Sequence, residues 1–503
     1  MGETQNGPPQ SVLECTFNRA VKVHSTDDRL SSDSGALLLR EADHRLGLTE
    51  SLAERLIDPR QPDKIRYQQL ELLRNRLYAL AQGYSAQDDL DRLAHDPALR
   101  MAVWDRPGEA VLHERLPSQP TQSRFVDTLA YQRGNREALR EALVDWTHRH
   151  LRATGGNRAV AWGTVDVDSF PIEVHGQQQG AAYNGHYHQK MYYPQVASFS
   201  VAGDYDSTRE GHRLGNGFVH ATLRPGTVPS QQGSRRFLRE VLRKVQPLAR
   251  TVDLRLDAAF MIGEVLDFLT NEKVRFVGRL KGNPQLDLLA EPHLTRPAGR
   301  PPCEGYEYTV ELGPYRAAPW QHAQRLVLVV VDRPDPASGQ LFLMPRYFFL
   351  LVGWKEGEMT ADEALAHYRK RGTFEDRLGE FNQAIGPHLS ALQFAENEVT
   401  LLLALLAYNL VSLLRLELED AVGGQWDLAR FQNQVLKTAG RVAKHSRQLR
   451  IYIAQSAEFF WSLLGQRMSQ WRLPSRWSPP RGPGPRDWVP PPPHAHQKVV
   501  LRC

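Results

Sequence analysis

The most informative stretch of this chain reads His367-Tyr368-Arg369-Lys370-Arg371-Gly372-Thr373-Phe374-Glu375-Asp376-Arg377 and continues to Asn382. Its composition predicts a helix, which begins with a capping box formed by Thr360 and Glu363. At about 100° per residue, four of its polar side chains share one helix face: Tyr368, Arg371, Glu375 and Asn382. This combination suits phosphate chemistry, because the acid can hold a divalent cation while the guanidinium and the phenol bind phosphates.

The spacing also resembles a known signature. Tyr368-x2-Arg371-x3-Glu375 is most of the Y-x2-R-x3-E-x6-K pattern of bacterial insertion-sequence transposases of the cut-and-paste DDE class. The chain departs from the pattern at its last position, where Asn382 replaces the lysine. A solvated helix with a chance pairing of arginine and glutamate would have the same spacing, so the assignment depends on the other segments as well.

Length and composition set broad limits on the chain. With 503 residues it is expected to form two to four domains. The net charge of +5 is compatible with nucleic acid but is not diagnostic. The three cysteines are far apart, so neither a disulfide framework nor a zinc site is expected. No secretory signal is visible, and the apolar run from Val399 to Leu414 is shorter than the ~20 residues of a membrane span. We therefore expect a protein of the bacterial cytoplasm, associated with the nucleoid and not with a membrane.

Residues 34 to about 151 show apolar side chains at helical spacing, which predicts an N-terminal all-helical domain over residues 1–152. Four short segments are similar, in order and spacing, to the N-terminal region of one transposase group within the DDE class: Leu46–Thr49, Ala81–Tyr84, His95–Leu99 and Pro117–Phe125. This domain is expected to bind DNA. The alternative is that its helices only pack against a catalytic domain.

The central part of the chain predicts a mixed sheet. Strands are expected at Ala159–Ile172, Met191–Val201, Phe218–Leu223 and from Val252, with a crossover helix at Arg235–Val245 before the last of these. Three antiparallel strands, a crossover helix and a fourth strand ending in an acid is the order of an RNase H-like fold. We therefore predict an α/β (α+β) protein with an RNase H-like, mixed five-stranded sheet, flanking helices, and a fifth strand at Arg346–Val352.

In that fold one acid lies on the first strand, one just after the fourth, and one on a late helix. The corresponding residues here are Asp168 or Asp166, then Asp257, then Glu375. Together they are predicted to bind two Mg²⁺ about 3.5–4 Å apart, with Mn²⁺ as a substitute. The family resemblance favours Asp168, because Asp168-Ser169 looks like the family's first acid followed by a small hydroxyl residue.

Two neighbouring segments extend the resemblance, which covers roughly residues 15 to 465. The loop His175–His186 closely matches the loop that follows the first acid in the same group. Leu256-Asp257-Ala258-Ala259-Phe260 is similar to the second-acid segment, although a serine–glycine pair is commoner after that acid.

The C-terminal half predicts several further features. A β-rich insertion between Gly282 and Pro345 is expected to hold the DNA end, and Tyr347 or Phe348 is expected to pack in the core rather than stack on a base. Asn397, Tyr408 and Asn409 are expected to be buried polar residues. The segment from Leu428 to Ala457 contains no acid, and we predict that it forms basic helices whose cations bind DNA phosphates, with a solvated face as the alternative: Arg441, Lys444 and Arg447.

We predict a helical domain at 1–152, followed by a catalytic domain in two parts, 153–281 and 346–420, that are separated by the insertion at 282–345. The basic helices are predicted at 421–473 and a disordered Pro-rich tail at 474–503. The resemblance implies a transposase that binds the terminal inverted repeats of an insertion sequence as a homodimer. It would cleave this double-stranded DNA and join it to target DNA, with a hairpin intermediate in which Tyr368, Arg371 and Asn382 lie near the phosphates. The alternatives are a metal-dependent nuclease or resolvase, and a non-catalytic DNA-binding remnant.

Overall fold

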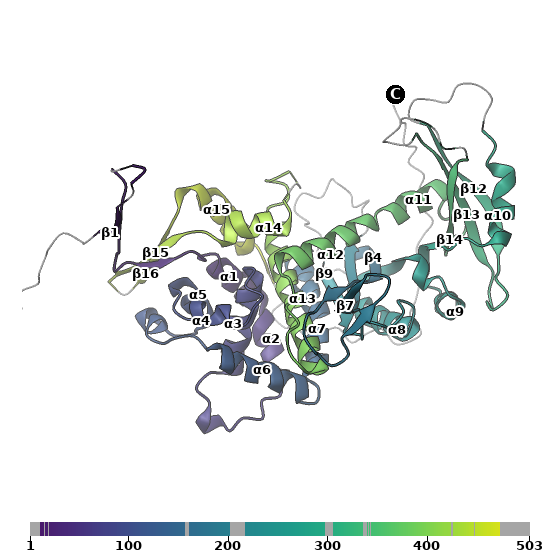
Figure 1. Cartoon of the computed structure of the whole chain (residues 1–503). Helices are drawn as coiled ribbons and strands as arrows, with labels where there is room; N and C mark the ends of the chain where they lie inside the picture. Colours follow the sequence, from purple (N-terminus) through teal and green to yellow (C-terminus); the bar gives the residue numbers. More distant parts are fainter. Residues whose placement is uncertain are drawn as a thin grey trace, which may run out of the picture.

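The computed structural model describes residues 11–14, 16–18, 20–155, 160–201, 217–296, 305–334, 340, 342, 344–423, 426–446 and 448–472. It is a mixed α/β structure in which a helical region and a large sheet lie side by side (Figure 1). The tail predicted at 474–503 lies outside the described residues.

An eight-stranded mixed sheet forms the centre of the fold. Its spatial order is β12-β13-β14-β11-β10-β4-β8-β9, in which β10 is parallel to β4 and to β11 and the other neighbours are antiparallel. The bounds are β4 (Val160–Ser169), β8 (Gln195–Val201), β9 (Gly217–Thr222), β10 (Ala249–Leu256), β11 (Arg275–Leu280), β12 (Tyr306–Tyr315), β13 (Gln324–Asp332) and β14 (Arg346–Val352). The predicted strands at 159–172, 218–223 and 252 onward are confirmed as β4, β9 and β10, whereas Met191–Val201 is divided into β7 (Gln189–Tyr192) and β8.

The predicted place of Arg346–Val352 in the sheet is wrong. The fifth strand from β9 is β11, and β14 pairs on one side with β11 and on the other with β13. The strands of the expected insertion therefore continue the same sheet, because Leu350 of β14 lies opposite Arg279 of β11 and Val327 of β13 at once. The sheet has eight strands and not five.

Helices cover both faces of the sheet. The crossover helix α8 (Ser234–Val245) and α9 (Gly263–Asn271) pack their apolar side chains against β4 and β10 in one core cluster. On the other face, α11 (Ala361–Arg369) packs against β11, β13 and β14 through Ala364 and Leu365. A short 3₁₀ turn (Ala258–Phe260) begins one residue after the end of β10, and α10 (Pro284–Ala290) follows β11.

The helical region of residues 36–155 is built around a helix from the C-terminal half. The central α13 (Phe394–Leu416) shares one hydrophobic core with the surrounding helices. It is long and apolar enough to cross a membrane by length and composition, but 94% of its most apolar window is buried, as is typical of a core helix. The surrounding helices are α1 (Ala36–Leu46), α2 (Leu48–Ala53), α3 (Gln69–Ala81), α4 (Asp89–Leu93), α5 (Pro97–Val103), α6 (Gln119–Tyr131) and α7 (Asn135–Gly155).

The buried polar residues on α13 connect it to the sheet, as predicted. The side chain of Asn409 accepts from the Phe218 N–H and donates to the Phe218 carbonyl, both at 2.8 Å. Asn397 donates to the Ala391 carbonyl at 2.8 Å. These two asparagines are buried and their hydrogen bonds are made within the protein, which confirms their role in packing.

The predicted late helix is interrupted. It forms α11 and α12 (Gly372–Ala384), with Lys370 and Arg371 at the junction. The predicted capping box is confirmed, since the Glu363 N–H donates to Thr360 Oγ1 at 3.2 Å and the Thr360 N–H donates to Glu363 Oε2 at 2.8 Å.

The prediction of basic helices at the C-terminal end is wrong for most of the segment. A short α14 (Leu428–Phe431) and a π-helical turn (Gln432–Leu436) are followed by a hairpin, β15 (Gly440–His445) and β16 (Gln448–Ile453), and then by α15 (Glu458–Ser469). Along β16 the half-buried Leu449, Ile451 and Ile453 alternate with exposed residues, which favours strand over helix. Arg441 and Lys444 therefore lie on a strand, and Arg447 lies outside the described residues.

The N-terminal segment adds strands that the sequence did not indicate. β3 (Arg29–Ser31) pairs with β15, and β1 (Ser11–Glu14) pairs with β2 (Lys22–His24). A second small sheet, β5 (Ile172–Glu173), β6 (Ala182–Asn184) and β7, follows β4.

Candidate active site

Two of the predicted acids lie at the C-terminal ends of two adjacent strands of the sheet. Asp168 is near the end of β4, and Asp257 follows the last residue of β10. The two strands are parallel neighbours in which Leu256 lies opposite Val167, so the next residue on each strand is one of these acids. Burial raises the pKa of Asp168, and the charge of Asp257 adds to this rise.

Arg371 connects this pair to the third predicted acid. Its guanidinium donates to the carboxylates of Asp168 and Glu375 at the same time. Arg371 is buried whereas the Glu375 side chain is 61% exposed. Burial of the guanidinium works against its charge, but the carboxylates of Asp168, Asp257 and Glu375 outweigh burial and raise the pKa of Arg371.

The environment of Asp168 has two opposing effects. Burial raises the pKa of its carboxyl group, while the charge of Arg371 and the Ser169 N–H, which donates to Asp168 Oδ1 at 2.7 Å, lower it. The net direction is upward. The site therefore holds this acid more weakly ionised than an aspartate in water, and the guanidinium limits that effect.

Asp166 is placed differently from Asp168. Its carboxylate forms a two-point ion pair with Arg255 of β10, with Oδ1 at 2.8 Å from Nε and Oδ2 at 2.6 Å from Nη2. Both side chains are buried. Asp166 is thus fully engaged inside the sheet.

The face that carries these acids is covered by the helix bearing the signature residues. Along β10, Asp253 lies 3.2 Å from His367 Nε2 and accepts from Trp162 Nε1 at 2.7 Å. Arg255 donates to the His367 carbonyl at 3.4 Å. Contacts from two alternate residues of β10, which point to the same face, therefore fix the end of α11 over the sheet and place Arg371 beside Asp168.

The other two predicted signature residues, Tyr368 and Asn382, lie before and after Arg371 and Glu375 in the chain. Tyr368 is half-buried, and burial raises its pKa, with the charge of Arg371 opposing and that of Asp257 adding to the shift. Asn382 is exposed near the end of α12. The helix predicted to carry all four residues on one face is interrupted, so Tyr368 lies on α11, Arg371 lies at the junction, and Glu375 and Asn382 lie on α12.

Two residues near the acids were not predicted as site residues. Tyr187 lies in the turn between β6 and β7, and burial raises the pKa of its phenol, with Tyr193, Asp168 and Asp257 adding to the shift. Its hydroxyl lies 3.2 Å from that of Tyr193. Arg224 donates to Ser169 Oγ at 2.8 Å and so supports the residue next to Asp168. The segment of Tyr187 directly follows the loop matched at His175–His186, which was the available signal.

A cavity of about 410 Å³ opens beside Asp257. Arg279 and Lys281 supply positive charge to its wall, and the Arg279 guanidinium lies 5.3 Å from the centre of the Phe348 ring. Tyr347 and Phe348 line this cavity while they also pack against the core clusters, so the expected core packing describes only part of their surroundings.

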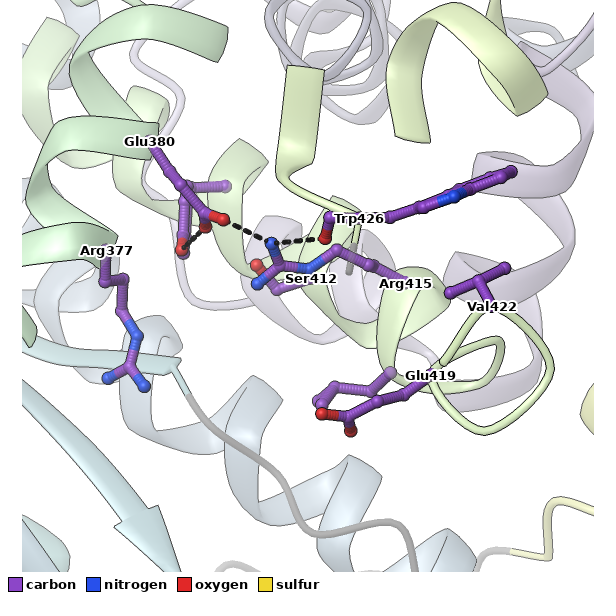
Figure 2. A pocket seen from close by; sticks show the side chains of 9 residues that line it. Arg377, Glu380, Ser412, Arg415, Glu419, Val422 and Trp426 are labelled. Atoms are coloured by element: carbon purple, nitrogen blue, oxygen red, sulfur yellow. Dashed lines mark hydrogen bonds and ion pairs between the residues drawn. The ribbon is translucent and has the colours of Figure 1, made fainter. Parts of the chain in front are cut away.

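A second cavity, of about 210 Å³, lies between α12 and α13 (Figure 2). Glu380 joins the two helices, since it accepts from Arg415 Nη1 at 2.7 Å and from the Tyr408 hydroxyl at 3.1 Å. Arg377 donates to Ser198 Oγ of β8 at 2.7 Å. These contacts fix the helix that carries Glu375 against α13 and β8.

The described residues contain no group of three histidine, cysteine, aspartate or glutamate side chains placed to hold a metal ion. The carboxylates of Asp168 and Asp257 are hard oxygen donors of the kind that Mg²⁺ takes. Glu375 is turned to Arg371, which keeps it out of a common cluster. The donor types therefore fit a divalent cation, with two of the three acids adjacent.

The cations that the sequence predicted to bind phosphates near the C-terminal end, Arg441 and Lys444, lie away from the three acids. The hairpin β15–β16 is on the opposite side of the molecule from β12–β14 (Figure 1). Lys444 is paired with Glu109 at 2.5 Å, and Arg441 is exposed. The structure thus does not bring these residues to the three acids.

A large mixed sheet with covering helices and acids at adjacent strand ends is consistent with an α+β transposase fold. The comparison of sequences agrees, because residues 13–467 match the family described as transposase DDE domain group 1. This match spans nearly the whole chain, and the chain belongs to this family of DDE transposases. The family is one of DNA-cleaving and DNA-transferring enzymes that generally use divalent metals such as Mg²⁺. No curated protein matches the chain.

Proposed function

We propose that this protein binds the terminal inverted repeats of an insertion sequence and catalyses Mg²⁺-dependent cleavage and strand transfer. The observation that carries the proposal is the contact between Arg371 of the signature helix and Asp168 of β4, with Asp257 on the neighbouring strand. The order β9-β8-β4-β10-β11, with β10 parallel to β4, supports the RNase H-like arrangement. DNA is the partner expected for this family, and the bacterial cytoplasm its expected compartment.

We assign Asp168, Asp257 and Glu375 as the residues that would hold two Mg²⁺, with Mn²⁺ as a substitute. When bound, the ions would supply stabilisation of the attacking and leaving oxygens of a phosphoryl displacement. The chain's own contribution would be to place the carboxylates and to keep Asp168 ionised through Arg371.

Arg371 would have a second role in binding. A DNA phosphate is a two-point partner for a guanidinium, as a carboxylate is. A phosphate that engages Arg371 would compete with Asp168 and Glu375, which would free the two carboxylates. Binding of the substrate and assembly of the acid cluster would thus be linked.

The remaining signature residues would hold phosphates near a hairpin on the transposon end. Tyr368 is close to Arg371 and Asp257, which suits this role. Asn382 lacks the charge of the family's lysine, so the phosphate contacts would include one cation fewer. The protein would act as a homodimer that bridges two DNA ends and the target.

The test is cleavage of a duplex that carries the DNA flanking the coding sequence, with Mg²⁺, by the wild type and by Asp257→Asn. We expect cut and joined products from the wild type and neither from the variant, while a matched change of an exposed acid, Glu272→Gln, keeps both activities. Cut ends that are never joined would identify a nuclease or resolvase. Binding without any cut by the wild type would identify a non-catalytic remnant.

A further inference from the structure

We propose that the outer face of the hairpin β15–β16 binds the major groove of duplex DNA. This inference rests on the proposed function and deepens it, because it names the surface, the groove and the residues that make the contact. It also separates the cations of the hairpin into a binding set and a structural set, which the sequence alone did not do.

The pairing of the strands defines two faces. Arg441 lies opposite Tyr452 on one side and Leu30 of β3 on the other, Ala443 lies opposite Arg450, and His445 opposite Gln448. Residues opposite one another in an antiparallel pair point to the same side. Because Arg441, Ala443 and His445 are two residues apart on β15, all of these side chains share one face.

The inner face packs on the protein. Val442 is buried, and Leu449 and Ile451 pack against the large helical core. Lys444 and Arg29 are on this side as well, and both contact Glu109, at 2.5 and 3.3 Å. Glu109 carries one negative charge for these two cations, and the two ion pairs hold both side chains to the protein, which gives them a structural role.

The outer face is open and positively charged. Arg450 is exposed, and the Arg441 side chain is 49% exposed. The Arg441 guanidinium lies 5.2 Å from the centre of the Tyr452 ring, which is exposed too, and 3.9 Å from the nearest Asp28 oxygen. The ion pair between Arg441 and Asp28 is long, and both of its side chains are about half exposed. No acid occurs from Leu428 to Ala457. This face therefore complements a polyanion.

The shape of the hairpin selects the groove. β3 pairs only with Gly440–Val442, whereas β15 and β16 pair as far as His445 and Gln448. The outer part of the hairpin is therefore a two-stranded ribbon, and β16 is an edge strand. The major groove of B-DNA, about 12 Å wide, admits a two-stranded ribbon as it is, whereas the minor groove, about 6 Å wide, takes one only after the duplex is deformed at a cost in free energy. His445 and Gln448, at the outer end of the ribbon, then lie where side chains reach base edges, and Arg441 and Arg450, further back, lie beside the phosphates.

The test measures binding of the full chain to a 30-base-pair duplex from the flanking DNA and to a scrambled duplex, at several salt concentrations. Arg441→Ala/Arg450→Ala should weaken binding of the flanking duplex at least 10-fold and lower the salt slope by about 2. Lys444→Ala, on the same strand but on the inner face, is the matched control and should stay within 2-fold. Methyl green, which occupies the major groove, should compete with the wild type, and netropsin, which occupies the minor groove, should not.

Each other result would overturn the proposal. Wild-type binding with an unaffected double variant would exclude this face, and an equal loss in Lys444→Ala would exclude the assignment of faces. Competition by netropsin alone would exclude the major groove. Failure of the wild type to bind any duplex would overturn the proposed function as well as this inference. The other three results would overturn this inference alone, so the two failures are distinguishable. Circular dichroism of each variant confirms that it is folded.

Discussion

Asp166 of β4 and Arg255 of β10 form a buried two-point ion pair between adjacent parallel strands, at 2.8 and 2.6 Å. The pair commits Asp166 to the interior of the sheet. Asp168, two residues further on, contacts Arg371 at the strand end instead. We therefore keep Asp168 in the proposed site and assign Asp166 a structural role.

The two aspartates should respond differently to the same substitution. Asp166→Asn leaves Arg255 charged and buried without its partner, which should cost about 3–5 kcal/mol of unfolding free energy. Asp168→Asn should change stability less, because Arg371 keeps Glu375 as a second carboxylate partner, but it should abolish DNA cleavage. Urea unfolding and a cleavage assay on both variants check this. A stable Asp166→Asn protein that cannot cut would reverse the assignment.

Arg371→Ala should change the pH dependence of cleavage. The guanidinium lowers the pKa of Asp168 against the effect of burial, so its removal should raise that pKa further. Because the proposed role needs the ionised acid, the acidic limb of the pH profile should move to higher pH. The pH dependence of kcat/KM, which reports the free enzyme, measures it, with Arg371→Lys as the variant that keeps the charge. An unchanged midpoint in Arg371→Ala would refute the proposed effect.

His148 should make the fold sensitive to acid. Burial, with the charge of Arg152 adding to it, lowers the pKa of this imidazole to about 4, and Arg152 Nε donates to His148 Nε2 at 3.0 Å. Between about pH 6.5 and 4 the unfolded chain binds the extra proton and the folded chain does not, so stability falls as the pH falls. The loss should reach about 3 kcal/mol.

His148→Gln tests this directly, because glutamine can accept the same hydrogen bond and cannot be protonated. Urea unfolding at pH 7 and pH 4.5 should show a smaller acid loss in this variant than in the wild type. The exposed His113→Gln serves as the control and should behave as the wild type does. Equal acid losses in all three proteins would contradict the prediction.

Asn382→Lys should strengthen binding of the DNA end. The side chain is exposed near the C-terminal end of α12, where a cation is also favourable for the helix. A restored charged phosphate contact should add about 1–3 kcal/mol to binding. Titration of the flanking duplex measures the gain, and the neutral Asn382→Gln should show none. No gain with lysine would show that this position does not contact the bound end.

Local signals predicted much of the fold. The capping residues Thr360 and Glu363, the strand ending before Asp257 and the helix at 235–245 depend on neighbours in sequence, and the structure has each of them. The contact of Arg371 with Glu375 follows from helical spacing in the same way. The buried role of Asn409 followed from its place in an apolar run.

Features that depend on distant partners were missed. β14 has the composition of a central strand, but only its pairing with Val327 of β13 shows that the sheet continues beyond it. Tyr187 approaches Asp168 because a small sheet folds the turn back, which no local pattern indicates. The hairpin at 440–453 was available from the alternation of Leu449, Ile451 and Ile453, but the run of cations was given more weight than this period.

The central claim is that Glu375 acts with the two strand acids in DNA strand transfer. The most direct measurement is excision and joining of a marker flanked by the element's own ends, with Mg²⁺, for the wild type and for Glu375→Gln. The neighbouring exposed Asp376→Asn is the matched control. Our account predicts excision and joining by the wild type and the control, and their loss in Glu375→Gln. Full activity in Glu375→Gln, or DNA binding without cleavage by the wild type, would contradict it.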